Sequence, residues 1–100
     1  MTLALGATWT ARPGHEDEII RILAELTPAT RAEKGNLLYV PTRSADDPSV
    51  FYLFEVYEDA DAYDAHTLSE HFTRLVKDDA IPHHLASRER SYYEPLGDPA

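Results

Sequence analysis

Cysteine is absent from this 100-residue sequence, and basic residues are few. Without cysteine there are no disulfides, no thiolate nucleophiles, no cysteine-ligated zinc and no iron–sulfur clusters. Only nine Lys and Arg stand against 18 Asp and Glu, which gives a formal net charge of −9. Because such an acidic surface repels phosphate backbones and anionic lipids, we expect neither a nucleic-acid partner nor a membrane partner.

Long apolar runs are also absent. No stretch approaches the ~18 residues of a membrane-spanning helix, and the N-terminus lacks the pattern of a secretory signal. Hydrophobic residues make up 43% of the chain and charged residues 27%, which is ordinary for a globular protein. We expect one soluble, cytoplasmic domain over residues 1–96 and a flexible tail at residues 97–100.

Hydrophobic periodicity predicts the order strand, helix, strand, strand, helix, strand. The predicted ranges are 3–12, 15–33, 36–43, 50–58, 60–66 together with 69–79, and 85–96. Pro28 predicts a kink or break near Thr27, and Pro82 predicts that the second helical region ends by Asp79. This order is typical of a ferredoxin-like α+β fold, with an antiparallel sheet and both helices on one face.

The strand at residues 50–58 is apolar on both faces. One row comprises Val50, Tyr52, Phe54 and Val56, and the other comprises Phe51, Leu53 and Tyr57. The helices cover one row, and a second copy of the sheet is the economical cover for the other. We therefore predict a symmetric homodimer with two sheets face to face.

Three polar residues are candidates for catalysis. Glu55 interrupts the apolar strand, where a carboxylate is costly unless it is paired, and it can either orient a His or serve only as a structural partner. His66 and His71 lie about 140° apart on a continuous helix, so they share a face only if the helix breaks at residues 67–69. Either His can act as a base towards a phenolic proton, or pack structurally.

Other site chemistries have little support. Two His beside Glu70 resemble pieces of a metal site, but there is no H-E-x-x-H motif, so we predict no metal. There is no glycine-rich phosphate loop and no G-x-S-x-G motif. Trp9 fits either the core or the wall of an aromatic pocket, and the ten aromatic residues suit an aromatic ligand.

Four blocks of sequence carry a resemblance to a known family. They are residues 12–18, residues 35–39, the run from Phe51 to His66, and residues 69–72. Together they resemble the antibiotic biosynthesis monooxygenase domain, which is also found in small quinol monooxygenases, over residues 3–95. The resemblance implies a dimeric α/β barrel of ferredoxin-like subunits with a pocket between the sheet and the helices. It also implies oxidation of a small quinol or aromatic polyketide by O₂ without metal, flavin or haem.

The resemblance also implies site residues. Glu55 and His66 match recurrent polar positions of the family, Asn36 stands where Cys or a small residue is common, and Tyr57 stands where many relatives have Trp. We predict that Glu55 and Tyr57 face the helices and the pocket. The predicted catalytic residues are His66, Glu55 and His71, and the predicted substrate-binding residues are Trp9, Asn36, Tyr57, Phe72 and Tyr63.

Two alternatives of the same fold stay open. One is an isomerase or cyclase in which His66 moves a proton without O₂, and the other is a non-catalytic ligand-binding or stress-response dimer. Haem degradation is not expected, because Ala7 stands roughly where haem-degrading relatives have Asn.

Overall fold

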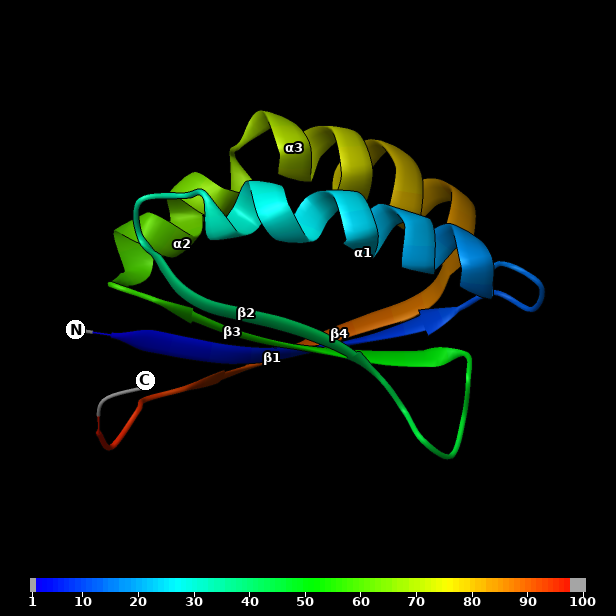
Figure 1. Ribbon diagram of the computed structural model, residues 1–100, viewed down its shortest axis with the longest axis horizontal. Helices are drawn as coiled ribbons and strands as arrows, with labels where there is room; N and C mark the ends of the chain where they lie inside the picture. The colour runs from blue at the N-terminus through cyan, green and yellow to red at the C-terminus, as the bar shows by residue number, and fades with distance from the viewer. Residues whose placement is uncertain (1, 98–100) are drawn as a thin grey trace.

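The computed structural model describes residues 2–97, so residues 98–100 of the predicted tail lie outside the described part. Four antiparallel strands form one sheet in the order β2-β3-β1-β4, and the helices cover one of its faces (Figure 1). The strands are β1 (Leu3–Ala11), β2 (Asn36–Arg43), β3 (Val50–Tyr57) and β4 (Leu85–Tyr93). The predicted ferredoxin-like α+β fold is confirmed.

The helical layer contains two long pieces and two short ones. They are α1 (Glu16–Arg31), α2 (Ala60–Thr67), α3 (Glu70–Phe72) and the π-helical η1 (Thr73–His84). α1 begins after a turn at Gly14, whose φ of +85° is accessible mainly to glycine. Glu16, Asp17 and Glu18 occupy its first turn, where the helix dipole favours negative charge. Within residues 2–97, no helix is long and apolar enough to cross a lipid bilayer.

Of the kink or break predicted near Thr27, the break does not occur. α1 continues through Pro28 to Arg31. Pro28 lies in the last turn, and its missing N–H removes one backbone hydrogen bond. The hydroxyl of Thr27 donates to the carbonyl of Leu23 at 2.6 Å, which satisfies an acceptor in the same turn.

The prediction that Pro82 ends the second helical region by Asp79 was wrong, because η1 continues to His84. The guanidinium of Arg12 donates to the carbonyl oxygens of Pro82 at 3.1 Å, His83 at 3.3 Å and Leu85 at 3.2 Å. These bonds satisfy acceptors that the end of a helix leaves free. The last turn therefore persists despite the proline.

Strand β4 ends at Tyr93 rather than at residue 96. Tyr93 pairs with Ala4, close to the start of β1, so residues beyond it have no strand partner. β2 lies at an edge of the sheet, where Pro41, which lacks an N–H, is tolerated.

The hydrophobic core lies between the sheet and the helices. Alternate residues of β1 point into it, and α1 contributes a stripe at helical spacing. The central members are Leu5, Ala7, Trp9, Ile19, Ile22, Leu23, Leu26, Tyr39, Phe51, Leu53, Tyr57, Phe72, Leu75 and Val76. We call the helix-covered side of the sheet the inner face and the other side the outer face. Glu55 lies between Leu53 and Tyr57 on the inner face.

Candidate functional site

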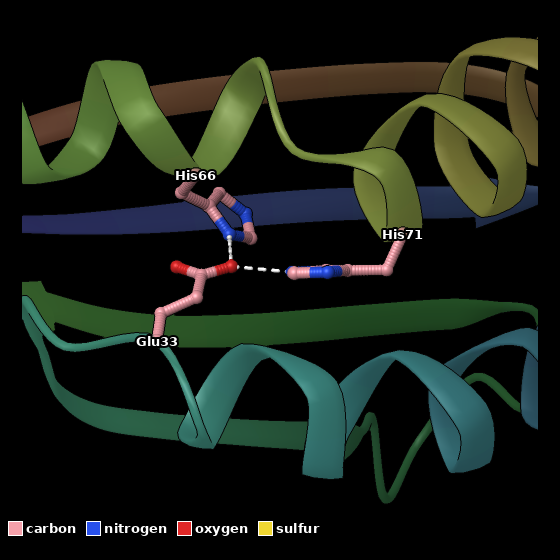
Figure 2. A group of neighbouring side chains, drawn as sticks. All are labelled: Glu33, His66 and His71. Carbon is pink, nitrogen blue, oxygen red and sulfur yellow. Dashed lines mark hydrogen bonds and ion pairs between the residues drawn. The ribbon is translucent and has the colours of Figure 1, made fainter.

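Two helix N-caps determine where the segments that carry His66 and His71 begin. The backbone N–H of Ala62 donates to the Asp59 carboxylate at 2.8 Å, which starts α2, and the N–H of Phe72 donates to the Ser69 hydroxyl at 3.2 Å, which starts α3. The helix is therefore interrupted between Thr67 and Glu70. This break was predicted as the condition for His66 and His71 to share a face, and both side chains point to the same place (Figure 2).

Both histidines converge on Glu33, which lies just beyond the end of α1 (Figure 2). The Nδ1 atom of His66 lies 2.7 Å from Glu33 Oε2, and the Nε2 atom of His71 lies 2.5 Å from the same oxygen. Sequence reasoning did not single out Glu33. A signal existed, because an acid beside the C-terminal end of a helix opposes the dipole and therefore needs another partner.

Glu33 sets the tautomer of His66. An ionised carboxylate only accepts hydrogen bonds, so the Nδ1 atom of His66 and the Nε2 atom of His71 are the donors. A neutral His66 then has its free lone pair on Nε2. This is the arrangement in which a carboxylate orients an imidazole to act as a base through its other nitrogen.

A second carboxylate faces that free nitrogen. Glu55 Oε1 lies 3.9 Å from His66 Nε2, beyond hydrogen-bond distance, and accepts a 2.7 Å hydrogen bond from the Tyr57 hydroxyl. Burial raises the pKa of Glu55, an effect that Tyr57 and His66 partly oppose. Burial likewise raises the pKa of Tyr57, so its phenol keeps the proton that it donates.

Aromatic rings enclose His66, whose side chain is 2% exposed. The rings of Tyr39, Tyr57, Tyr63 and Phe72 have centroids 6.3, 5.3, 6.2 and 5.0 Å from that of His66. They come from β2, β3, α2 and α3. The site therefore consists of Glu33, Glu55 and His66, largely buried and surrounded by aromatic rings.

Two predicted substrate-binding residues do not join this group. Trp9 is 2% exposed in the core and pairs with Phe51 across the sheet, several residues along β1 from Leu5, the partner of Glu55. The side chain of Asn36 donates to the carbonyl of Leu38 at 3.2 Å, beside the irregularity that opens β2. Tyr57, Tyr63 and Phe72 do lie against His66. The roles of all these residues remain predictions.

A cavity lies elsewhere in the fold. A volume of about 620 Å³ opens between α1 and β2, with Ile20, Leu23, Thr27, Val40 and Phe51 among its lining residues. Neither His66 nor Glu55 lines this cavity. This cavity is therefore not the pocket that was predicted beside the candidate base, and that pocket remains a prediction.

The three convergent side chains also form a potential metal-ligand set. The ligand atoms of Glu33, His66 and His71 lie within 4.8 Å of one another, and two His with one carboxylate can bind zinc or iron. The separations of 2.7 and 2.5 Å are hydrogen-bond distances, and with an ionised Glu33 both nitrogens are the donors. Binding of an ion there would require both nitrogens to give up the protons of these hydrogen bonds.

Comparisons with known proteins identify the family and the fold. The family model described as antibiotic biosynthesis monooxygenase matches residues 2–78. The structure of PA3566 from Pseudomonas aeruginosa is 32% identical, with 96% of this chain and 95% of that chain covered and a TM-score of 0.89. The structure of Rv0793 from Mycobacterium tuberculosis is 25% identical over the whole of both chains, also with a TM-score of 0.89.

A further solved structure, described as an antibiotic biosynthesis monooxygenase, is 28% identical, with 95% of this chain and 99% of that chain covered and a TM-score of 0.86. No curated protein matches the sequence. The family model spans more than half of the chain, and these structures match its fold from end to end. The chain therefore belongs to the antibiotic biosynthesis monooxygenase family.

Proposed function

We propose that this protein is a cofactor-independent monooxygenase that oxidises a small quinol or aromatic polyketide with O₂. Family membership supports a function of this general type. The observation that carries the specific proposal is the geometry at His66. Its Nδ1 atom is held by Glu33 and its Nε2 atom faces Glu55 inside a cage of aromatic rings.

The first step is removal of a phenolic proton. His66 Nε2 accepts the proton, and the Glu33 carboxylate, 2.7 Å from Nδ1, stabilises the imidazolium that results. His71 donates to the same Glu33 oxygen and keeps that carboxylate in place. The low exposure of His66 limits hydration of the ion pair, which strengthens these interactions.

The second step transfers electrons from the phenolate to O₂. Where the anion is conjugated with a ring CH₂, carbon and O₂ combine as a peroxide. Loss of water then leaves a carbonyl, so that CH₂ + O₂ gives C=O + H₂O. The protonated Nε2 atom of His66 is the acid that can return its proton to the departing oxygen. The protein orients the ring, moves the proton and excludes bulk water.

Glu55 and Tyr57 assist from the sheet. The raised pKa of Glu55 favours its neutral form, which limits repulsion with Glu33 across His66. The Tyr57 hydroxyl holds Glu55 in position at 2.7 Å. We therefore assign Glu33 and Tyr57 as positioning residues and His66 as the base.

The test is oxygen uptake with an anthrone-type phenol and a naphthalene quinol, measured above the spontaneous rate. His66→Ala should lower kcat by about 10²–10⁴-fold. Glu33→Gln should lower kcat by about tenfold or more, because a neutral amide does not stabilise the imidazolium that forms on His66. His83→Ala, which removes an exposed histidine outside the site, should leave the rate unchanged.

Circular dichroism of each variant separates loss of chemistry from loss of fold. No enzyme-dependent oxygen uptake across a broad panel of phenols and quinols would contradict the proposal. Turnover of a carbonyl compound under anaerobic conditions would instead indicate an isomerase or cyclase. Ligand affinity without any turnover would indicate a binding module.

A further inference from the structure

Two arginines lie side by side on the inner face of β4. Arg88 pairs with Trp9 and Arg90 pairs with Ala7, and both β1 partners point into the core. Within residues 2–97 neither arginine forms an ion pair with a carboxylate, although the chain carries 18 acidic residues. Arginines that lack a directly paired carboxylate and lie beside an aromatic cluster are suited to binding an acidic group.

Arg88 has an unmet hydrogen-bond requirement. Its Nε atom is buried and has no hydrogen-bond partner among residues 2–97. Its guanidinium carbon lies 5.9 Å from the centroid of the Phe72 ring, which packs in turn against His66 at 5.0 Å. Burial lowers the pKa of Arg88, which means that the charged form is poorly solvated where it stands. A buried donor without an acceptor is costly, and an acidic ligand group would remove that cost.

Arg90 connects the same place to the candidate base. Its Nη1 atom donates to the Tyr63 hydroxyl at 3.0 Å. The Tyr63 ring stacks on His66 at 6.2 Å and meets the half-exposed ring of Tyr92 edge-on at 6.0 Å. A row of rings therefore runs from the surface at Tyr92 to His66, with a guanidinium along it.

The geometry points to a substrate that carries an acidic group. We propose that Arg88 and Arg90 bind a carboxylate of an aromatic hydroxy acid, which lies between Tyr63 and Phe72 with its hydroxyl towards His66. A guanidinium matches the two oxygens of a carboxylate, and aromatic walls suit a planar ring. This inference rests on the proposed function for the role of the hydroxyl, and it adds the class of substrate.

The test compares two probes that differ only in the acidic group, 6-hydroxy-2-naphthoic acid and 2-naphthol, by titration calorimetry. Non-specific electrostatics disfavour the acid, because the protein carries a net charge of −9. We expect the acid nevertheless to bind at least about tenfold more tightly, as a charge-assisted pair requires. Arg88→Gln and Arg90→Gln should each reduce this preference to about threefold or less.

Arg43→Gln is the matched control. Arg43 lies on β2 at the opposite edge of the sheet, and its loss changes the net charge by the same amount. It should leave the preference for the acid intact. Arg88→Lys keeps the charge without the planar fork and serves if Arg88→Gln does not fold, with an expected partial loss of the preference.

Equal affinity for the two probes in the wild type, or an undiminished preference in the folded Arg88 and Arg90 variants, would overturn the inference. Oxygen uptake reports separately on the proposed function. A preference for the acid that depends on both arginines, without uptake on any phenol or quinol, would leave the acid site standing and refute the monooxygenase. Oxygen uptake without a preference for the acid would support the monooxygenase and refute the acid site.

Discussion

At the scale of single residues, Glu33 organises the candidate site. One of its oxygens accepts hydrogen bonds from two histidines on different helical segments. Its other oxygen, Oε1, is buried without a hydrogen-bond partner in the described part of the chain. A carboxylate held in this way directs the lone pair of His66 towards Glu55 and the aromatic rings. The chemistry proposed for His66 therefore depends on Glu33, which acts through His66 and does not itself take the substrate's proton.

Glu55 gives a prediction at the same scale. Because burial raises its pKa above the ordinary value of 4.5, the folded state holds this proton more tightly than the unfolded state. Its contribution to stability is therefore fully present below pH 4.5 and is lost as the pH rises through the raised pKa. Glu55→Gln retains an acceptor for Tyr57 and cannot ionise, so it should be relatively more stable than the wild type at neutral pH.

The measurement is urea unfolding of both proteins at a series of pH values from about 4 to 9. The difference between the two free energies of unfolding isolates Glu55 from the other carboxylates. It should move in favour of Glu55→Gln as the pH rises. A difference that does not vary with pH would show that Glu55 ionises as freely in the folded chain as in the unfolded one.

At the scale of elements, the interruption between α2 and α3 is the decisive feature. A continuous helix would separate His66 and His71 by about 140° around its axis. Asp59 and Ser69 start two separate helical segments instead, and both histidines reach Glu33. The caps therefore contribute to the site by setting where each segment begins.

The cap at Asp59 can be tested directly. Asp59→Ala removes the acceptor for the Ala62 N–H and should lower the free energy of unfolding by about 1 kcal/mol. Asp59→Asn retains an oxygen at the same position and should preserve most of the stability. Urea unfolding of the three proteins measures the effect. Equal loss in both variants would assign the effect to the charge of Asp59, not to its hydrogen bond.

At the scale of the whole molecule, the outer face of the sheet has no helical cover (Figure 1). Val40, Tyr52 and Phe54 are 36%, 41% and 36% exposed on it, and the ring of Tyr52 lies where a Gly6 side chain would be. Neighbouring exposed apolar side chains on one sheet are typical of an interface. We propose that a second copy covers this face and forms a homodimer.

Light scattering coupled to size exclusion measures the oligomer. The wild type should have about twice the 11.3 kDa mass of one chain. Phe54→Glu places a charge in the proposed interface and should shift the population to the monomer. Leu68→Glu, at a residue that is 76% exposed between α2 and α3, is the control and should leave the dimer intact. A compact wild-type monomer at dilute concentration would contradict the homodimer.

Much of the fold followed from local patterns. Period-two alternation in residues 3–11, the apolar strand around Leu53 and the caps at Asp59 and Ser69 all act between near neighbours, so the sequence by itself predicted the elements and their order. The predicted helix break and the predicted helix end that do not occur both concern prolines in final turns. At Pro82 the compensation comes from Arg12, which is 70 residues away in the chain, and no local pattern contains it.

Some residues of the candidate site were likewise identifiable from the sequence, and others only from the structure. Glu55, His66 and His71 are identifiable in the sequence, because a carboxylate in an apolar strand and histidines beside a helix break are locally unusual. Glu33 and the pair Arg88 and Arg90 acquire their significance only in three dimensions. Hydrogen-bond partners and desolvation depend on which distant segments fold together. The sequence thus determined which elements form, and only the tertiary structure decided which of their charged groups meet.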